Sequence, residues 1–458
     1  MLNSIPRALA PVCFAVLATS AISVAQAEGP PQRIIVKYHA TPNANTAATA
    51  SSQRNMSDVT ARYGIAMTNV RRATSGAQIM KLSDPVSREN LAQMVKDLAA
   101  DPNVEYAEED RLLQASFTPN DTFYNVQWHY FEAAGGLNLP SAWDVATGSG
   151  VTVAVIDTGY RPHADLAANI VGGYDFISDT FVSRDGNGRD SSALDPGDYY
   201  AANECGSGVP GSNSSWHGTH VAGTIAARTN NGLGVAGVAF NARVLPIRVL
   251  GRCGGYTSDI ADGLTWASGG TISGVPANPN PAKVASLSLG GGGACESYMQ
   301  SAVNGARARG TTVIVAAGND AANAVNFSPG NCTGVITVAA VNRNGGRAYY
   351  SNFGSIVDVA APGGDTRSSA ANGVASTLNS GTTTPGTDVY AYYQGTSMAT
   401  PHVSGVAALM LSVNPSLTPA QIESLLKSTT RTFPATCSQC GTGIVNAAAA
   451  VNAAAAAR

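Results

Sequence analysis

The chain has 458 residues, a formal net charge of −3, and only 12% charged residues. This length can bury one large α/β domain together with a smaller one, and the lack of a basic excess gives no support for nucleic-acid binding. The 49 glycines and 44% hydrophobic residues indicate a compact, turn-rich protein rather than a disordered one.

The N-terminus, residues 1–27, has the pattern of a secretory signal peptide. Arg7 supplies a positive charge, residues 8–25 form an apolar run, and Ala25 and Ala27 are the small residues of a cleavage site. A membrane anchor is the alternative, but Ser, Thr and Pro interrupt the run and nothing later is apolar enough to cross a bilayer. We expect export and cleavage, with no membrane association afterwards.

Residues 28–115 predict a separate small α+β unit. Residues 32–40 alternate as a strand, residues 87–100 follow a helical pattern, and residues 103–110 predict a second strand. Three of the chain's five lysines fall in this unit, whereas the composition shifts to Gly, Ser, Ala and Asn from residue 116 onward.

Residues 116–458 alternate buried strands with helices. Helical patterns at 258–268 and 296–310 lie between the β-branched runs. The predicted strands are 150–159, 242–250, 283–291 and 311–319. Continuous apolar strands that alternate with helices predict an α/β fold with a doubly wound, mostly parallel sheet. Functional sites of such sheets lie outside the carboxyl ends of the strands.

Export also decides how the cysteines are interpreted. Cys13 lies in the signal segment, which leaves six cysteines, and an even number in an oxidising compartment predicts three disulfides. The sequence leaves many pairings open, and the simplest is sequential: Cys205–Cys253, Cys295–Cys332 and Cys437–Cys440. The last two cysteines could instead form a redox pair, but no thioredoxin-like pattern surrounds them.

Three polar residues stand in glycine-rich turns beside predicted strand or helix ends. They are Asp157, His217 and Ser397, in that chain order. A serine hydroxyl is a poor nucleophile at neutral pH, so a histidine must take its proton and a carboxylate must orient the histidine. Each residue alone could be a helix cap or a core side chain. Together they predict nucleophilic catalysis.

The segments that carry these residues resemble the three signatures of the subtilisin-like serine proteases. They read VAVIDTG, HGTHVAGT and GTSMATPHVSG, and the resemblance covers nearly all of residues 119–450. Segments such as TPNDTFYNVQWHY and the cysteines resemble the thermitase-like and proteinase-K-like side of the family, including secreted proteases of Gram-negative bacteria.

The resemblance implies a role for each matching residue. Asp157 would orient His217, His217 would be the general base, and Ser397 would be the nucleophile. Asn319, in the matching segment AAGN, would stabilise the oxyanion together with the backbone N–H of Ser397. The substrate would contact Ser288, Leu289, Gly290, Ala317 and Gly318, with Asn326 at the floor of a pocket for a medium or large apolar side chain.

Two loops are candidate calcium sites. Residues 228–238 resemble the family's high-affinity calcium loop. The implied ligands are Asp121, Asp165, the side chain of Asn231, and the carbonyls of Thr229, Leu233 and Val235. The second candidate, RDGNGRD, offers Asp185, Asn187 and Asp190, but Arg189 stands where an oxygen ligand is expected. A solvated acidic loop is the alternative there.

The sequence therefore predicts a secreted, calcium-stabilised serine endopeptidase made as a self-processing pre-pro-enzyme. Residues 1–27 would be the signal, 28–115 an inhibitory propeptide, and 116–458 a monomeric peptidase acting on proteins or peptides. One alternative is an inactive, protease-shaped binding protein, although no catalytic residue is missing. Another is a metal-dependent hydrolase that uses His217 and His220, but the glutamate of an HExxH motif is absent.

Overall fold

The computed structural model describes residues 31–39, 50–112 and 117–457. The chain divides into two compact units between Ala115 and Ser116, where the composition shifts. The expected signal segment, residues 1–27, and residues 113–116 lie outside the described residues.

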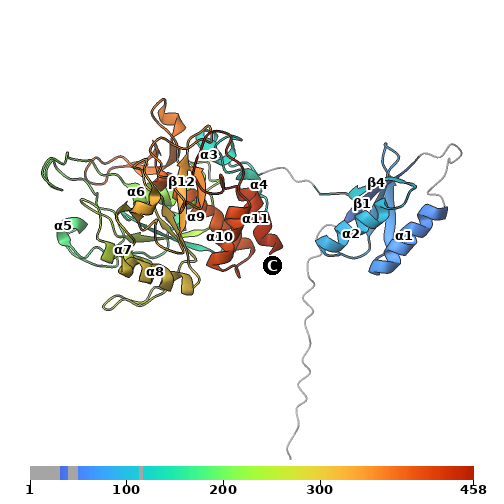
Figure 1. Ribbon diagram of the computed structural model, residues 1–458, viewed down its shortest axis with the longest axis horizontal. Helices are drawn as coiled ribbons and strands as arrows, with labels where there is room; N and C mark the ends of the chain where they lie inside the picture. Colours follow the sequence, from blue (N-terminus) through green and yellow to red (C-terminus); the bar gives the residue numbers. More distant parts are fainter. Residues whose placement is uncertain (1–30, 40–49, 113–116, 458) are drawn as a thin grey trace, which may run out of the picture. The chain divides into compact units, whose positions relative to one another are not determined.

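The first unit is a four-stranded antiparallel sheet with two helices on one face (Figure 1). Its elements are β1 (Arg33–Tyr38), α1 (Ala50–Tyr63), β2 (Met67–Arg72), β3 (Gln78–Leu82), α2 (Arg88–Ala99) and β4 (Val104–Glu109), and the strand order is β2-β3-β1-β4. Ile34 and Val36 of β1 are buried with Leu91, Met94 and Leu98 of α2, because alternate strand residues share a face. The sequence predicted β1, α2 and β4.

The second unit is built on a seven-stranded parallel sheet in the order β13-β12-β10-β8-β5-β7-β6. The strands are β5 (Thr152–Asp157), β6 (Tyr174–Asp175), β7 (Arg243–Arg248), β8 (Val284–Leu287), β10 (Thr312–Ala316), β12 (Ile336–Val341) and β13 (Val359–Pro362). The predicted doubly wound, mostly parallel sheet is confirmed.

Helices cover both faces of this sheet (Figure 1). Successive residues of β5 point to opposite faces, so Val153 and Val155 belong to one core while Ala154 and Ile156 belong to the other. The first core includes α6 (His217–Ala226), α9 (Thr396–Val413), α10 (Pro419–Ser428) and α11 (Ala447–Ala456). The second includes α7 (Thr257–Ala267) and α8 (Ser297–Ala308).

Smaller elements complete the second unit. They are η1 (Tyr124–Val126), α3 (Trp128–Phe131), α4 (Pro140–Trp143), η2 (Ala167–Asn169), α5 (Thr180–Ser183), β9 (Gly291–Gly292), η3 (Ala324–Asn326), β11 (Phe327–Ser328), η4 (Ala370–Asn372), β14 (Val374–Asn379) and β15 (Asp388–Tyr393). β9 pairs with β11, and β14 pairs with β15. The disulfides follow the sequential pairing: Cys205–Cys253, Cys295–Cys332 and Cys437–Cys440.

All four tryptophans of the chain lie in the second unit and are buried. Each indole N–H donates to a backbone carbonyl: Trp128 to Gly373, Trp143 to Val238, Trp216 to Gly381 and Trp266 to Pro276. Among the described helices, none combines the length and apolar character needed to span a membrane.

Candidate active site

Asp157 ends β5 in the middle of the parallel sheet, and its side chain is fully buried. Both of its carboxylate oxygens face His217, whose Nδ1 lies 2.8 Å from Oδ1 and 2.9 Å from Oδ2. His217 begins α6, and a Cβ on the next residue, Gly218, would lie 2.1 Å from the carbonyl oxygen of Gly159. The glycine therefore lets the helix start against the turn after β5.

The surroundings of His217 raise the pKa of its imidazole. Burial, the largest single cause, lowers this pKa, but the charge and hydrogen bond of Asp157 and the charges of Asp198 and Asp195 together outweigh it. Because Nδ1 is hydrogen-bonded to Asp157, Nε2 is the nitrogen left to exchange a proton. The imidazole is 21% exposed and lines a cavity, so that exchange can occur with a group bound there.

Ser397 lies in the first turn of α9. Its Oγ donates to the carbonyl oxygen of Ser288 at 3.3 Å, and Ser288 Oγ donates to the carbonyl oxygen of Ser397 at 2.8 Å. Pro401, one turn later, has no N–H for that carbonyl, so Ser288 replaces the missing helical hydrogen bond. No hydrogen bond joins Ser397 to His217 within the described chain; catalytic hydrogen bonds are often long before substrate binds.

Asn319 follows β10, close to the start of α9. Its Oδ1 accepts hydrogen bonds from the backbone N–H of Thr396 at 2.8 Å and from Thr396 Oγ1 at 2.9 Å. These bonds fix which end of the amide is the donor, since Nδ2 is the end left without a partner in the described chain. Thr396, the residue before Ser397, thus orients a candidate oxyanion donor beside the candidate nucleophile.

The fully buried Asn352 supports the backbone that leads to and follows Asn319. Its Nδ2 donates to the carbonyl oxygen of Ala317 at 2.9 Å, and its Oδ1 accepts from the backbone N–H groups of Asp320 and Ala322 at 2.9 and 3.0 Å. Sequence reasoning identified neither Thr396 nor Asn352. For Thr396 the available signal was its place within the serine signature; Asn352 stands in no motif.

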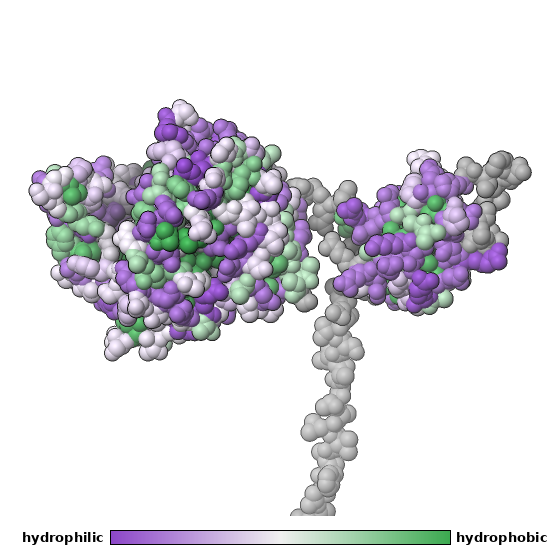
Figure 2. Space-filling view, viewed as in Figure 1, coloured by the Kyte–Doolittle hydropathy of each residue, from purple (hydrophilic) through white to green (hydrophobic). Residues whose placement is uncertain are grey.

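A cavity of about 740 Å³ opens beside His217. Its lining includes His217, Leu250, Ile260, Ser288, Leu289, Gly290, Glu296, Met299, Ser328 and Pro329. Figure 2 shows hydrophobic and hydrophilic residues interspersed over the visible face of this unit. Three predicted substrate contacts, Ser288, Leu289 and Gly290, therefore share one cavity with the candidate base.

Asn326, predicted at the floor of the substrate pocket, does not line this cavity, and neither do Ser397 and Asn319, so its role stays a prediction. Asn326 ends η3, is exposed, and is absent from the lining. Pairing of β11 with β9 places Ser328 and Pro329 in the wall instead. Ala317 and Gly318 are also outside the lining; they lie at the end of β10 next to Asn319.

The first candidate calcium loop has the donor groups that such an ion requires. Asp121 and Asp165 are both buried, and Asp121 Oδ1 has no hydrogen-bond partner. Burial, the largest cause, raises the pKa of both carboxyls, and for Asp121 the nearby charge of Asp165 raises the pKa further. Two buried acids this close favour a bound cation.

The loop between these acids contributes further oxygens. Asn231 Nδ2 donates to Asp165 Oδ1 at 2.8 Å, and the N–H of Val235 donates to Asp165 Oδ2 at 2.9 Å. The carbonyl oxygens of Thr229, Leu233 and Val235 accept no hydrogen bond within the described chain. Unused carbonyls beside an unpartnered carboxylate oxygen fit calcium, which prefers oxygen ligands.

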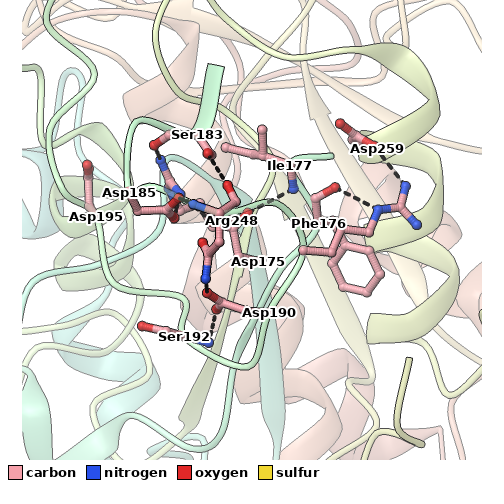
Figure 3. Close-up of polar contacts among 12 residues, drawn as sticks. Asp175, Phe176, Ile177, Ser183, Asp185, Asp190, Ser192, Asp195, Arg248 and Asp259 are labelled. Carbon is pink, nitrogen blue, oxygen red and sulfur yellow. Dashed lines mark hydrogen bonds and ion pairs between the residues drawn. The ribbon is translucent and has the colours of Figure 1, made fainter. Parts of the chain in front are cut away.

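The second candidate loop is occupied by an arginine (Figure 3). Arg248 Nη1 contacts Asp185 Oδ2 at 2.7 Å and also pairs with the buried Asp175. Asn187 Nδ2 donates to Asp190 Oδ2 at 2.7 Å. Neither this loop nor the first brings together three acidic, histidine or cysteine side chains among the described residues. Asp185 is thus ion-paired with Arg248, and Asn187 and Asp190 hydrogen-bond each other; neither the calcium prediction nor the alternative of a solvated acidic loop foresaw this arginine.

Three other histidines are buried near the site. His129 Nδ1 lies 2.8 Å from His402 Nε2, and His402 Nδ1 lies 2.7 Å from the carbonyl oxygen of Met398. His220 stacks on Tyr393 and hydrogen-bonds the carbonyl oxygen of Ala391. Burial lowers the pKa of all three imidazoles, so each is neutral at pH 7 and serves packing.

Comparison with known proteins identifies the family to which this fold and this site belong. Residues 148–443, which contain Asp157, His217 and Ser397, match the model of the subtilase family, peptidase S8. The match spans more than half of the chain, so the chain belongs to the subtilase family and is a serine endopeptidase.

Named relatives agree with this assignment. The chain is 55% identical over 431 residues to the extracellular protease of Xanthomonas campestris, covering 92% of this chain and 73% of the relative. It is 42% identical over 433 residues to the extracellular basic protease of Dichelobacter nodosus, covering 92% and 70%. A solved protease structure from Pseudoalteromonas arctica is 67% identical, with a TM-score of 0.73, and covers 74% of this chain and all of that chain.

Proposed function

We propose that the protein cleaves peptide bonds through Asp157, His217 and Ser397. The observation that carries this proposal is the paired contact between His217 Nδ1 and both oxygens of Asp157. A neutral imidazole with its proton on Nδ1 keeps a lone pair on Nε2. Nε2 takes the proton of Ser397 Oγ as the oxygen attacks the substrate carbonyl, and then gives that proton to the leaving amine.

The resulting acyl-enzyme is hydrolysed by water activated at the same imidazole. During both steps the negative oxygen accepts hydrogen bonds from Asn319 Nδ2 and from the backbone N–H of Ser397, at the positive end of α9. Fixation of Asn319 Oδ1 by Thr396 supports this role. The substrate extends along Ser288, Leu289 and Gly290 as an added strand, with Ala317 and Gly318 beside the reacting carbonyl.

Calcium is the proposed structural ion. Asp121, Asp165, Asn231 and the carbonyls of Thr229, Leu233 and Val235 would hold it. When bound, the ion neutralises two buried carboxylates and ties the loop to the remainder of the unit. None of those residues lines the cavity that contains His217, so the ion would stabilise the fold and would take no part in bond cleavage.

We also propose export and self-processing. Residues 1–27 act as the signal, residues 28–115 as an inhibitory propeptide, and residues 116–458 as the secreted, monomeric peptidase. The names of the extracellular relatives support secretion, and the boundary between the two compact units supports cleavage near Ala115. Proteins or peptides are the substrates.

The test of the catalytic proposal is covalent labelling of the purified peptidase with a phosphonyl fluoride. We expect loss of activity and one modified peptide that contains Ser397, while a zinc-selective chelator leaves activity intact. Ser301→Ala, which removes an exposed hydroxyl of α8 outside the cavity lining, serves as the matched control and should still be labelled. Labelling at another residue, or inhibition by the zinc chelator alone, would refute the mechanism and favour a metal-dependent hydrolase.

A further inference from the structure

The cavity beside His217 has an acidic wall. Among the described residues that line it, Asp198 and Glu296 are the carboxylates, and none is Lys or Arg. Arg252 neighbours the lining residues Gly251 and Cys253, but its guanidinium pairs with Glu204 and lies over Phe181. Glu204 is shared with Arg184, and Arg252 itself does not line the cavity.

Glu296 is held in place without being neutralised. It precedes α8 and follows Cys295, whose disulfide to Cys332 ties this wall to the segment that carries Ser328. The Glu296 carboxylate accepts a hydrogen bond from Ser328 Oγ at 2.9 Å, and no cation of the described chain forms an ion pair with it. An exposed, unpaired carboxylate at a fixed position can contact a cation on a ligand.

Apart from polar residues such as Ser328, part of the cavity lining is apolar. Leu250, Ile260, Leu289 and Met299 line the same space, and Gly290, Gly291 and Gly292 add no side chains to the wall. An apolar chamber with a carboxylate at its edge suits a side chain with an aliphatic stem and a cationic tip. Lysine and arginine have this form.

We propose that Glu296 makes this cavity select a lysine or arginine side chain of the substrate. The inference rests on the proposed function, because it uses Ser397 as the point of attack. Ser288 lies against Ser397, and the wall proceeds from Ser288 through Gly290 and β9 toward Glu296. The selected residue therefore lies several positions before the scissile bond, not at the bond itself.

The experiment compares fluorogenic peptides that carry lysine or norleucine at each of the four positions before the cleaved bond. Norleucine keeps the stem and lacks the ammonium group. At one upstream position we expect native protein to prefer lysine in kcat/KM. Glu296→Gln should reduce the lysine-to-norleucine ratio by about threefold to fivefold, the range of an exposed ion pair, and Glu296→Lys should reverse the preference.

Glu423→Gln provides the matched control. Glu423 lies on α10, away from the cavity lining, and pairs with Arg307 and Lys427, so this variant should keep the native ratio. The preference for lysine should also weaken with added salt in the native protein, since exposed charges are screened, but not in Glu296→Gln.

Two results would overturn the inference: no lysine preference at any of the four positions, or a native ratio in Glu296→Gln. Failure of the proposed function has a different signature, which is absence of turnover for every peptide or turnover that survives Ser397→Ala. Calorimetric binding of the same peptides to Ser397→Ala, with and without Glu296→Gln, measures the preference even then.

Discussion

Individual contacts around Ser397 explain how small polar residues prepare the site. Thr396 holds the oxygen end of Asn319, and Ser288 satisfies the carbonyl that Pro401 leaves free. Each contact fixes a group in advance, so that little reorganisation is needed when negative charge develops on the substrate oxygen.

Removal of the Asn319 amide should affect turnover far more than substrate binding. We expect Asn319→Ala to lower kcat by about 100-fold to 1000-fold, the typical effect of losing one oxyanion donor. Thr396→Val, which removes the Oγ1 contacts to Asn319 and to the N–H of Gly318 but keeps the backbone N–H contact to Asn319, should show a smaller loss of kcat. Steady-state kinetics on one peptide checks both. Equal losses, or a change in KM alone, would contradict the proposed role.

The acid limb of the pH profile should belong to His217. Its neutral form is the base, so kcat/KM should fall as pH drops through the raised pKa. Asp157→Asn removes the main contribution that raises this pKa, so the limb should move to lower pH while kcat falls by about 10⁴-fold. Asp198→Asn should shift the limb in the same direction by less. A limb unchanged in Asp157→Asn would argue against this assignment.

At the scale of elements, the candidate catalytic residues lie at strand ends and helix starts, and the parallel sheet determines where these meet. β5 and β10 end near the starts of α6 and α9, so residues far apart in sequence meet at one sheet edge. The loop at 229–235 returns to Asp121 and Asp165 and anchors the segment before α3. If the two carboxylates are left without a cation, we expect the loop at 229–235 to become mobile before the proposed catalytic residues are displaced.

Calcium removal should shorten the lifetime of the enzyme more than it slows each turnover. An ion at 100 times its dissociation constant contributes about 2.7 kcal/mol to the free energy of unfolding, so strong chelation should lower Tm and speed autolysis. Asp121→Asn should be less responsive to added calcium, whereas Asp190→Asn should respond like the native protein. Calorimetry with and without calcium decides, and an unchanged Tm in excess chelator would rule out the site.

At the scale of the molecule, the sequence was sufficient to predict the architecture but not the hydrogen bonds that hold the site residues in place. Apolar runs that end in Gly, Asp or Asn predicted four sheet strands, and the signatures predicted where Asp157 and His217 would meet. These hydrogen bonds could not be predicted because they join residues far apart in the sequence: Thr396 and Asn319 are 77 positions apart. The sequence also could not show that the pairing of β11 with β9, a tertiary event, brings Ser328 and Pro329 into the cavity wall.

Processing between the two units should require Ser397. Ser397→Ala removes the hydroxyl but no buried charge, so the fold should persist. Expressed with its signal in a host that lacks other proteases, this variant should begin near Glu28, while the native protein should begin near Ser116. N-terminal sequencing of both proteins gives the answer. A variant that also begins near Ser116 would show that a second enzyme makes the cut.

The burial of every tryptophan in the second unit gives the molecule a built-in optical reporter. Selective excitation of indole therefore reports on that unit alone, because the first unit has tyrosines, such as Tyr38 and Tyr63, but no tryptophan. In the uncleaved Ser397→Ala chain, emission should follow unfolding of the second unit alone, while far-ultraviolet dichroism follows both. Two separate midpoints would mean that each unit unfolds independently of the other in the uncleaved chain.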